Sequence, residues 1–249
     1  MDPLYGGHRK YNVSGNQLDK VMEQLNTSTS EVRTEQDDRL TPDLNQLANI
    51  FVEAFPRPSI DHQHTTLKLY QLLAEGEPVT KHRLARVLGK TTDSVSNILS
   101  QWPGVFYDEC DRIVAFLGLS LQKTPHQFTV NGITLYTWCA WDTLFIPELL
   151  NETASILSTC GTTGQKISLT VSPAGIEAVE PGYVVVSFLI PDILDLREKL
   201  TTSFCHYVYF FSSRSDGETW VSRHDGTFLL SLEEAFIVGQ KMNAARFSS

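Results

Sequence analysis

The stretch Tyr136-Thr137-Trp138-Cys139-Ala140-Trp141-Asp142-Thr143-Leu144-Phe145 places a thiol and a carboxylate among large apolar side chains. Around it, six residues recur at the spacing of one face of an α-helix: Leu135, Trp138, Cys139, Asp142, Phe145 and Ile146. Most of them are large and apolar, which predicts a helix whose stripe faces a core. Because Cys139 and Asp142 are three residues apart, they are neighbours on that face. The sequence thus predicts a buried thiol beside a buried carboxylate.

The carboxylate of Asp142 points to chemistry rather than to packing. A charged group on an apolar stripe is costly unless it is paired or held neutral. Desolvation raises the pKa of a carboxyl, which suits Asp142 to deliver a proton. Cys139 has two interpretations: a reactive thiol, or a small hydrophobe, which is the usual role of a lone buried cysteine. The question is which chemistry needs both groups.

The composition limits the classes of function. The chain has 249 residues, 41% of them hydrophobic, which is enough for one large domain or two small ones. Its 20 basic and 29 acidic residues give a net charge of −9, which disfavours a nucleic-acid or anionic-membrane binder. No apolar run approaches a membrane span, and the N-terminus lacks the layout of a signal peptide. We therefore expect a soluble, cytoplasmic protein with no nucleic-acid or membrane partner.

Four cysteines are spread along the chain: Cys110, Cys139, Cys160 and Cys205. None forms a CxxC pair, so a zinc-ribbon pattern is absent, and in a reducing cytosol we expect free thiols. Cys205 lies where a predicted helix meets a predicted strand, and side chains at such joints often line sites. If Cys205 faces Cys139, two thiolates could hold one soft ion between them.

Cys160 and His206 are further candidates. Cys160 precedes the turn Gly161–Gly164, and we interpret it as a structural thiol, with a third thiol near the site as the alternative. His206 could act as a base or a ligand. A histidine that heads a strand of aromatic residues more often has a structural role.

The patterning predicts an α+β fold in three parts. Residues 1–40 are polar, with few large apolar side chains, and are expected to be disordered. Residues 41–122 are expected to form a helical, winged-helix-like domain. Residues 123–249 are expected to form an α+β domain, in which a mixed or antiparallel sheet with flanking helices carries the candidate site.

The first domain is predicted from a run of short amphipathic segments. Four helices and a hairpin are expected in it: Thr41–Phe55, Thr65–Gly76, Lys81–Leu88, Asp93–Gln101 and Val105–Leu119. Three short helices followed by a two-stranded wing are typical of winged-helix modules, whose third helix reads DNA in a groove. Thr92–Gln101 contains no Lys or Arg, so we interpret the domain as a structural or docking module rather than a DNA binder.

The second domain is predicted from strand-like runs and turn signals. The Asn131-Gly132 turn indicates a hairpin that starts with Gln127–Val130, and Pro147 is expected to end or kink the central helix. Further strands and helices are predicted along the rest of the chain: the hairpin strands Ala154–Cys160 and Lys166–Val171, the strands Tyr183–Leu189 and His206–Phe211, and the helices Pro191–Leu200 and Leu232–Phe247.

The segment Tyr136–Leu144 resembles the active-site helix of organomercurial lyases (alkylmercury lyases). Three further regions resemble that family in the same order: Ser168–Pro173 with Ala178–Pro181, like its central hairpin; Ser203–Cys205 with Phe210-Phe211, like its second cysteine segment; and Glu233–Phe236 with Gly239-Gln240, like its C-terminal helix. The similarity runs from about Leu67 to Asn243, so it rests on several motifs rather than one.

The resemblance implies a reaction and its residues. It implies protonolysis of the carbon–mercury bond of R–Hg⁺ to a hydrocarbon and Hg(II), a step in mercury detoxification, with Cys139, Asp142 and Cys205 as catalytic and mercury-binding groups. It implies a structural role for Cys160 and no organic cofactor. Bound Hg(II) would leave by transfer to external thiols or a partner such as mercuric reductase. The winged-helix-like part of the family is not used to bind DNA.

Two features depart from the family pattern, and one alternative function remains. Many relatives have a second cysteine where this chain has His206, which could alter mercury release. The first sixty or so residues, with the Thr41–Phe55 helix, extend beyond the common core and have no assigned role. The alternative is a non-enzymatic, thiol-based mercury sensor or carrier, in the form of a winged-helix regulator. Asp142 argues against it, since a pure thiol binder has no use for a buried carboxylate.

Overall fold

The computed structural model describes residues 43–54, 58–102, 104–190 and 204–247 of the chain. The predicted disordered segment 1–40 and the predicted helix Pro191–Leu200 lie outside these ranges. The described residues form helices and two antiparallel sheets, which confirms an α+β fold. Among the helices of these ranges, none is long and apolar enough to cross a membrane.

The larger sheet has eight strands in the order β1-β2-β3-β5-β4-β6-β7-β8, and every pairing in it is antiparallel. Its strands are β1 (Val105–Tyr107), β2 (Ile113–Phe116), β3 (Leu119–Ser120), β4 (His126–Val130), β5 (Ile133–Thr137), β6 (Ala154–Thr159), β7 (Lys166–Ser172) and β8 (Gly175–Glu180). Because β3 pairs with β5, the sheet crosses the domain boundary expected at residue 122. The predicted wing, β1 and β2, is therefore the edge of the main sheet.

The smaller sheet has the order β10-β9-β11 and is covered by α8 (Arg214–Val221). Its strands are β9 (Val185–Leu189), β10 (Phe210–Phe211) and β11 (Thr227–Ser231). The predicted strand His206–Phe211 is wrong in its first half, where Cys205–Tyr207 form a single 3₁₀ turn, η1. The physical reason is Ser187 of β9, whose hydroxyl donates to the Tyr207 carbonyl (2.7 Å) and accepts from the Tyr209 amide (2.9 Å).

The other helices are α2 (Leu44–Ala54), α3 (Ile60–Leu73), α4 (Lys81–Leu88), α5 (Thr92–Leu99), α6 (Asp142–Leu150) and α9 (Leu232–Phe247). Most helix ends lie near the expected residues, but the expected start of α3 at Thr65 is wrong, because Ser59 caps the helix by accepting from the His62 amide and α3 begins at Ile60. Thr80 and Thr91 cap α4 and α5 by accepting hydrogen bonds from the amides of Arg83 and Ser94. The predicted boundaries of α4 and α9 are confirmed. Pro147 lies inside α6, which runs on to Leu150, so the helix does not end there, and a kink stays a prediction.

The predicted helix through Leu135 and Asp142 is also wrong in its first half. Asn131 and Gly132 take positive φ values of 50° and 77°, and this tight turn folds the next residues back onto β4 as β5. Ile133–Thr137 alternate in burial, as a strand does, and α6 begins only at Asp142. Residues 138–141 are therefore a turn that joins a strand to a helix.

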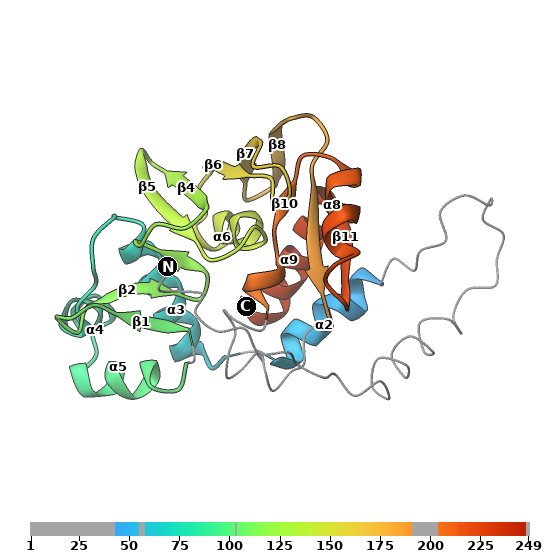
Figure 1. The fold of residues 1–249 in the computed structure, drawn as a ribbon. Coiled ribbons are helices and arrows are strands. Elements are labelled where there is room, and N and C mark those ends of the chain that lie inside the picture. The colour runs from blue at the N-terminus through green and yellow to red at the C-terminus, as the bar shows by residue number, and fades with distance from the viewer. Residues whose placement is uncertain (1–42, 55–57, 103, 191–203, 248–249) are drawn as a thin grey trace.

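Figure 1 shows how these elements surround α6. Helices α3–α5 lie with β1 and β2 at one end of the molecule, and the small sheet lies with α8, α9 and α2 at the other. Helix α6 packs between them, against α3, β7 and α9, while α2 packs along α9. The core thus runs through the centre of the molecule, where the candidate site residues lie.

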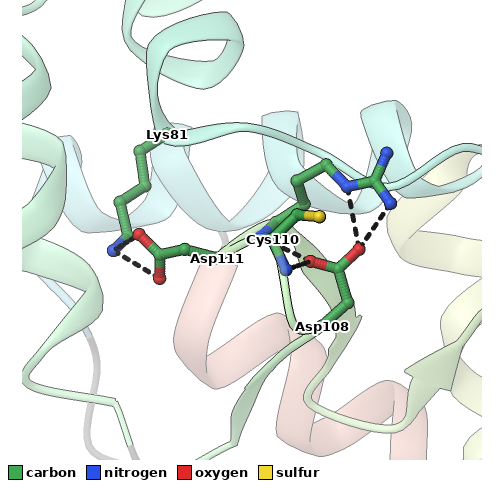
Figure 2. A network of polar contacts seen from close by, with 5 residues as sticks. Lys81, Asp108, Cys110 and Asp111 are labelled. Atoms are coloured by element: carbon green, nitrogen blue, oxygen red, sulfur yellow. Dashed lines mark hydrogen bonds and ion pairs between the residues drawn. The ribbon is translucent and has the colours of Figure 1, made fainter.

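The β1–β2 turn is attached to α4 by charged groups (Figure 2). Asp108 accepts from the amides of Cys110 and Arg112 at 3.0 and 2.9 Å, and Lys81 of α4 forms an ion pair with Asp111 at 2.8 Å. Cys110 itself is exposed. These contacts fix an exposed turn, so we assign this cluster a structural role.

Candidate active site

Three candidate residues from distant parts of the chain meet in the core. Cys139 lies in the β5–α6 turn, Asp142 is the first residue of α6, and Cys205 begins η1. One ligand atom from each, the two sulfurs and a carboxylate oxygen, lie within 4.8 Å of one another, and all three residues are buried. The juxtaposition that the sequence left conditional, Cys205 facing Cys139, is therefore present.

The β5–α6 turn holds Cys139 against the Asp142 carboxylate. The amide of Cys139 donates to Asp142 Oδ2 at 2.9 Å, and the hydroxyl of Thr137 donates to the Cys139 carbonyl at 3.0 Å. The Ala140 amide donates to the Val208 carbonyl at 3.2 Å, which ties this turn to the segment that carries Cys205. Cys139 and Asp142 are neighbours through a capping-type turn, and not through the helical spacing expected.

The turn between β2 and β3 lies close to the other carboxylate oxygen of Asp142, Oδ1. Gly118 has a φ of 100°, and a Cβ on it would stand 2.6 Å from Asp142 Oδ1. Leu117 beside it also has a positive φ, 37°, and its carbonyl accepts the Tyr70 hydroxyl of α3 at 2.6 Å. Neither Tyr70 nor Gly118 was expected at the site from the sequence. The only available signal was a glycine isolated between apolar strand residues, which is typical of close backbone approach.

The burial of the three groups shifts their pKa values. Burial raises the pKa of Asp142 to about 6, against the hydrogen bonds from Cys139 and the Trp138 amide that lower it. Burial likewise raises the pKa of the Cys139 thiol well above its usual value. The hydrogen bond with Cys139 lowers the pKa of Cys205, but burial and the Asp142 charge leave it raised in sum. With a pKa of about 6, the Asp142 carboxyl is mostly ionised at neutral pH, whereas both thiols are protonated, so the carboxylate is the base available beside them.

A mainly apolar cavity of about 40 Å³ opens onto this group. Asp142 and Cys205 line it, whereas Cys139 is fully buried behind them. Aromatic rings form much of its wall, and Phe51 of α2 packs against Trp141 and Phe204 with ring centroids 4.6 and 5.0 Å apart. Such a wall excludes water and accepts an apolar group beside the thiol.

The comparisons with known proteins identify the family. Residues 119–243 match the family model described as alkylmercury lyase. The alkylmercury lyase of Bacillus cereus is 44% identical over 174 residues, which are 70% of this chain and 78% of the relative. The enzyme of Pseudomonas putida is 44% identical over 172 residues, which are 69% of this chain and 79% of the relative. The enzyme of Streptomyces lividans is 39% identical over 177 residues, which are 71% of this chain and 80% of the relative. The chain belongs to the alkylmercury lyase family.

A solved structure shares the fold of this alkylmercury lyase family member. The crystal structure of the mercury-bound form of MerB2 has a TM-score of 0.66 and covers 81% of this chain and 98% of its own. The two chains are 24% identical, so the comparison bears on the fold alone. It covers more of this chain than residues 119–243, which the family model matches.

The remaining candidates lie outside the three-residue group of this family member. Cys160 is buried in the β6–β7 turn. Burial raises the pKa of its thiol, but hydrogen bonds with Thr163 and Ser212 outweigh burial and lower it overall. His206 is exposed on η1. Neither side chain joins the cluster of Cys139, Asp142 and Cys205.

Proposed function

We propose that Cys139, Cys205 and Asp142 carry out the carbon–mercury bond cleavage for which the alkylmercury lyase family is named. The single observation that supports this assignment is the buried contact of two thiols and one carboxyl at the wall of an apolar cavity. Two sulfurs suit mercury, which is a soft metal, and a carboxyl with a raised pKa suits proton transfer near neutral pH. The substrate is an organomercurial, R–Hg–X, in which X is a thiolate or another ligand.

The first step exchanges the ligand on mercury. Cys205 lines the cavity, so its sulfur meets the substrate first. Its thiol proton passes to the Asp142 carboxylate, the Cys205 sulfur bonds to mercury, and Asp142 gives that proton to X, which leaves as HX and restores the carboxylate. The organic group then lies among the aromatic rings beside the carboxyl.

The second step breaks the carbon–mercury bond. The Cys139 thiol gives its proton to Asp142 and its sulfur joins mercury, which raises electron density on the metal and makes the attached carbon basic. Asp142 delivers the proton to that carbon, so that RH leaves and Hg(II) remains between Cys139 and Cys205. Overall, R–Hg–X and two thiols are converted into RH, HX and one Hg(II) bis-thiolate, and the conversion needs no oxidant and no organic cofactor.

Release of Hg(II) completes the proposed cycle. External thiols displace the two protein sulfurs, and cellular thiols or mercuric reductase are the proposed acceptors. His206, which stands where many relatives have a second cysteine, is exposed and outside the cluster, so two protein sulfurs hold the metal, and an effect of His206 on release stays a prediction. Cytoplasmic location fits this dependence on reduced thiols and remains a prediction.

The N-terminal elements form a separate proposal. We interpret α3, α4 and α5 with β1 and β2 as a winged-helix-like unit within residues 41–122, followed by the catalytic part, 123–249. Helix α5 contains no Lys or Arg, so the unit is assigned a structural role. Its Tyr70 reaches the corner at Gly118, beside the reacting carboxyl.

The alternative function, a mercury sensor or carrier, is disfavoured by Asp142. A carrier gains nothing from a carboxyl that is 6% exposed and pressed against Gly118. Burying a carboxylate costs free energy, so a buried one suggests a chemical use. The carboxyl is explained by proton transfer and not by metal storage.

Product analysis tests the proposed function. Wild type, Cys139→Ser, Cys205→Ser and Asp142→Asn are incubated with phenylmercury and excess thiol, and benzene is measured. We expect benzene from wild type and at least about a hundredfold less from each variant, since each removes a reacting group. The Asp142→Asn variant keeps both sulfurs and should still bind mercury.

Mercury stoichiometry supplies the control. Because exposed Cys110 would also take up mercury, all proteins carry Cys110→Ser. One mercury per wild-type chain with no benzene would move the assignment to the sensor or carrier. Full turnover by Asp142→Asn would rule out its role as proton donor.

A further inference from the structure

One ring in the wall of the cavity comes from the N-terminal helix α2. Phe51 is 1% exposed and lines the cavity together with Asp142 and Cys205. Helix α2 packs along α9 (Figure 1) and lies outside residues 119–243, which the alkylmercury lyase model matches. The proposed cleavage reaction gives Phe51 no step. Its position in the same cavity as the reacting groups therefore calls for an explanation.

The ring of Phe51 contacts both segments that carry the cavity-lining reactive groups. It packs against Trp141, which directly precedes Asp142, with ring centroids 4.6 Å apart. It also packs against Phe204, which directly precedes Cys205, with ring centroids 5.0 Å apart. Trp141 and Phe204 line the cavity as well. Phe51 therefore borders the space that the organic group of a substrate would fill.

The cavity is small for the organic groups of bulky organomercurials. Its volume of about 40 Å³ corresponds to roughly three water-sized groups. A methyl group is close to a water molecule in size, whereas phenyl and naphthyl groups are several times larger. A large group therefore enters only when a side chain of the wall moves. Close-packed interiors resist such movement, because a displaced side chain loses contacts or leaves its preferred rotamer.

The packing of Phe51 makes it a wall residue that does not move easily. Besides Trp141 and Phe204, the ring of Phe188 in β9 meets it edge-on, with centroids 6.0 Å apart and planes at 79°. Tilted and edge-to-face aromatic pairs of this kind are favourable arrangements. By contrast, Met242 of α9 lines the same cavity with an unbranched side chain that adapts to its surroundings.

We propose that Phe51 limits the size of the organic group, which makes the site selective for small alkyl groups against bulky aryl groups. The inference rests on the proposed active site at Cys139, Cys205 and Asp142. Phe51 takes no part in the chemistry, since its ring offers neither a proton nor a metal ligand. It determines which organic groups can lie beside the Asp142 carboxyl while mercury is bound at the sulfurs. Helix α2 thereby contributes substrate selectivity.

The test compares a small and a bulky substrate in the same protein. It measures kcat/KM for methylmercury, which yields methane, and for 1-naphthylmercury, which yields naphthalene, both in excess 2-mercaptoethanol. The ratio of naphthyl to methyl is determined in wild type, Phe51→Leu, Phe51→Trp and Phe188→Leu. Phe188 is fully buried and packs against Trp141 and Phe204 as Phe51 does, but it is not among the described residues that line the cavity. Its variant loosens the same ring cluster away from the wall.

We expect Phe51→Leu to raise the ratio at least about tenfold, because a small change of space in an apolar pocket alters selectivity by this amount. Phe51→Trp should lower the ratio, since its larger ring takes up the same space. Phe188→Leu should stay within about twofold of the wild-type ratio.

The ratio separates a size limit from a loss of folding. A folding defect lowers turnover of both substrates together and leaves the ratio unchanged. An unchanged ratio in both Phe51 variants, or an equal rise in Phe188→Leu, overturns the role of Phe51. Absence of both methane and naphthalene with wild type would instead overturn the proposed function.

Discussion

At the scale of single residues, the burial of Asp142 gives its carboxyl a pKa suited to proton transfer and lowers the stability of the protein at neutral pH. Burial holds its folded-state pKa near 6, above the ordinary value of 3.8. A raised carboxyl pKa means that the folded state binds the proton more tightly than the unfolded state. Its contribution to stability is therefore full below about pH 4 and is lost as the pH rises through about 6. The enzyme is less stable at neutral pH because the carboxyl is kept in the core.

Asp142→Asn should stabilise the protein while it abolishes turnover. We expect the free energy of unfolding at about pH 8 to rise by up to roughly 3 kcal/mol, and the gain to vanish near pH 4. Urea denaturation of both proteins across this range measures the difference. An equal or lower stability of the variant at pH about 8 would contradict the buried charge.

Gly118→Ala should damage the site rather than the fold alone. The residue has a φ of 100°, and the new Cβ would stand 2.6 Å from Asp142 Oδ1. We expect a loss of at least about 2 kcal/mol in unfolding free energy and a turnover reduced by more than about tenfold, because the carboxyl must move.

Gly89→Ala is the matched control for that substitution. Gly89 has a φ of 64° at the end of α4, but nothing lies within 4 Å of its Cβ position. It should lose about 1 kcal/mol of stability through backbone strain alone and keep wild-type turnover. Equal turnover in both variants would show that contact with Asp142 does not matter.

At the scale of elements, the contacts of the β6–β7 turn support the structural role predicted for a third buried thiol, Cys160. Its amide donates to Gln165 and its carbonyl accepts from Gly164, at 2.8 and 2.9 Å. The next amide, of Gly161, donates to Phe210 of β10 at 2.9 Å and so links the two sheets. The thiol fills the space beneath a turn that connects them.

Cys160→Ser should therefore lower stability and leave chemistry intact. We expect a loss of about 1–2 kcal/mol in unfolding free energy, because a buried sulfur is replaced by a smaller polar atom. Hydrocarbon release per folded enzyme should stay within about twofold of wild type. A folded variant without turnover would show that the structural assignment is wrong.

At the scale of the whole molecule, a buried histidine sets the acid limit of stability. His126 of β4 is 2% exposed, its Nδ1 lies 2.8 Å from the Ser158 hydroxyl of β6, and burial lowers its pKa to about 4. Between about pH 4 and 6.5, the histidine is protonated in the unfolded chain, where its pKa is near 6.5, but stays neutral in the folded chain. Stability is full above about pH 6.5 and falls as the pH drops toward 4.

His126→Asn should remove this acid sensitivity. Between about pH 4 and pH 6.5, titration of Asp142 changes stability in the opposite direction from titration of His126. The comparison is therefore made in proteins that carry Asp142→Asn. We expect the protein that keeps His126 to lose roughly 3 kcal/mol of unfolding free energy between about pH 7 and pH 4, relative to the protein with the His126→Asn substitution. Parallel stability curves would contradict a buried neutral histidine.

The sequence alone determined the fold class and much of the site. Local signals, such as the helical pattern of Lys81–Leu88 and the Asn131-Gly132 turn, act over a few residues and could be read from the sequence. The family resemblance, on several motifs in order, named Cys139, Asp142 and Cys205 as a group. The sequence predicted a helix that already included Leu135, whereas Leu135 lies in β5. The spacing of the apolar residues around it fits a continuous helix as well as a strand followed by a helix.

Only the tertiary structure decided what surrounds those residues. Tyr70 and Arg246 line the cavity from α3 and the C-terminal helix, Gly118 contacts the Asp142 carboxylate from a strand corner, and no spacing in the sequence links them to Asp142. The physical reason is that burial and close contact are properties of the packed chain. Residue types specify which group can carry a proton, but the packing around Asp142 raises its pKa and brings it to the two sulfurs.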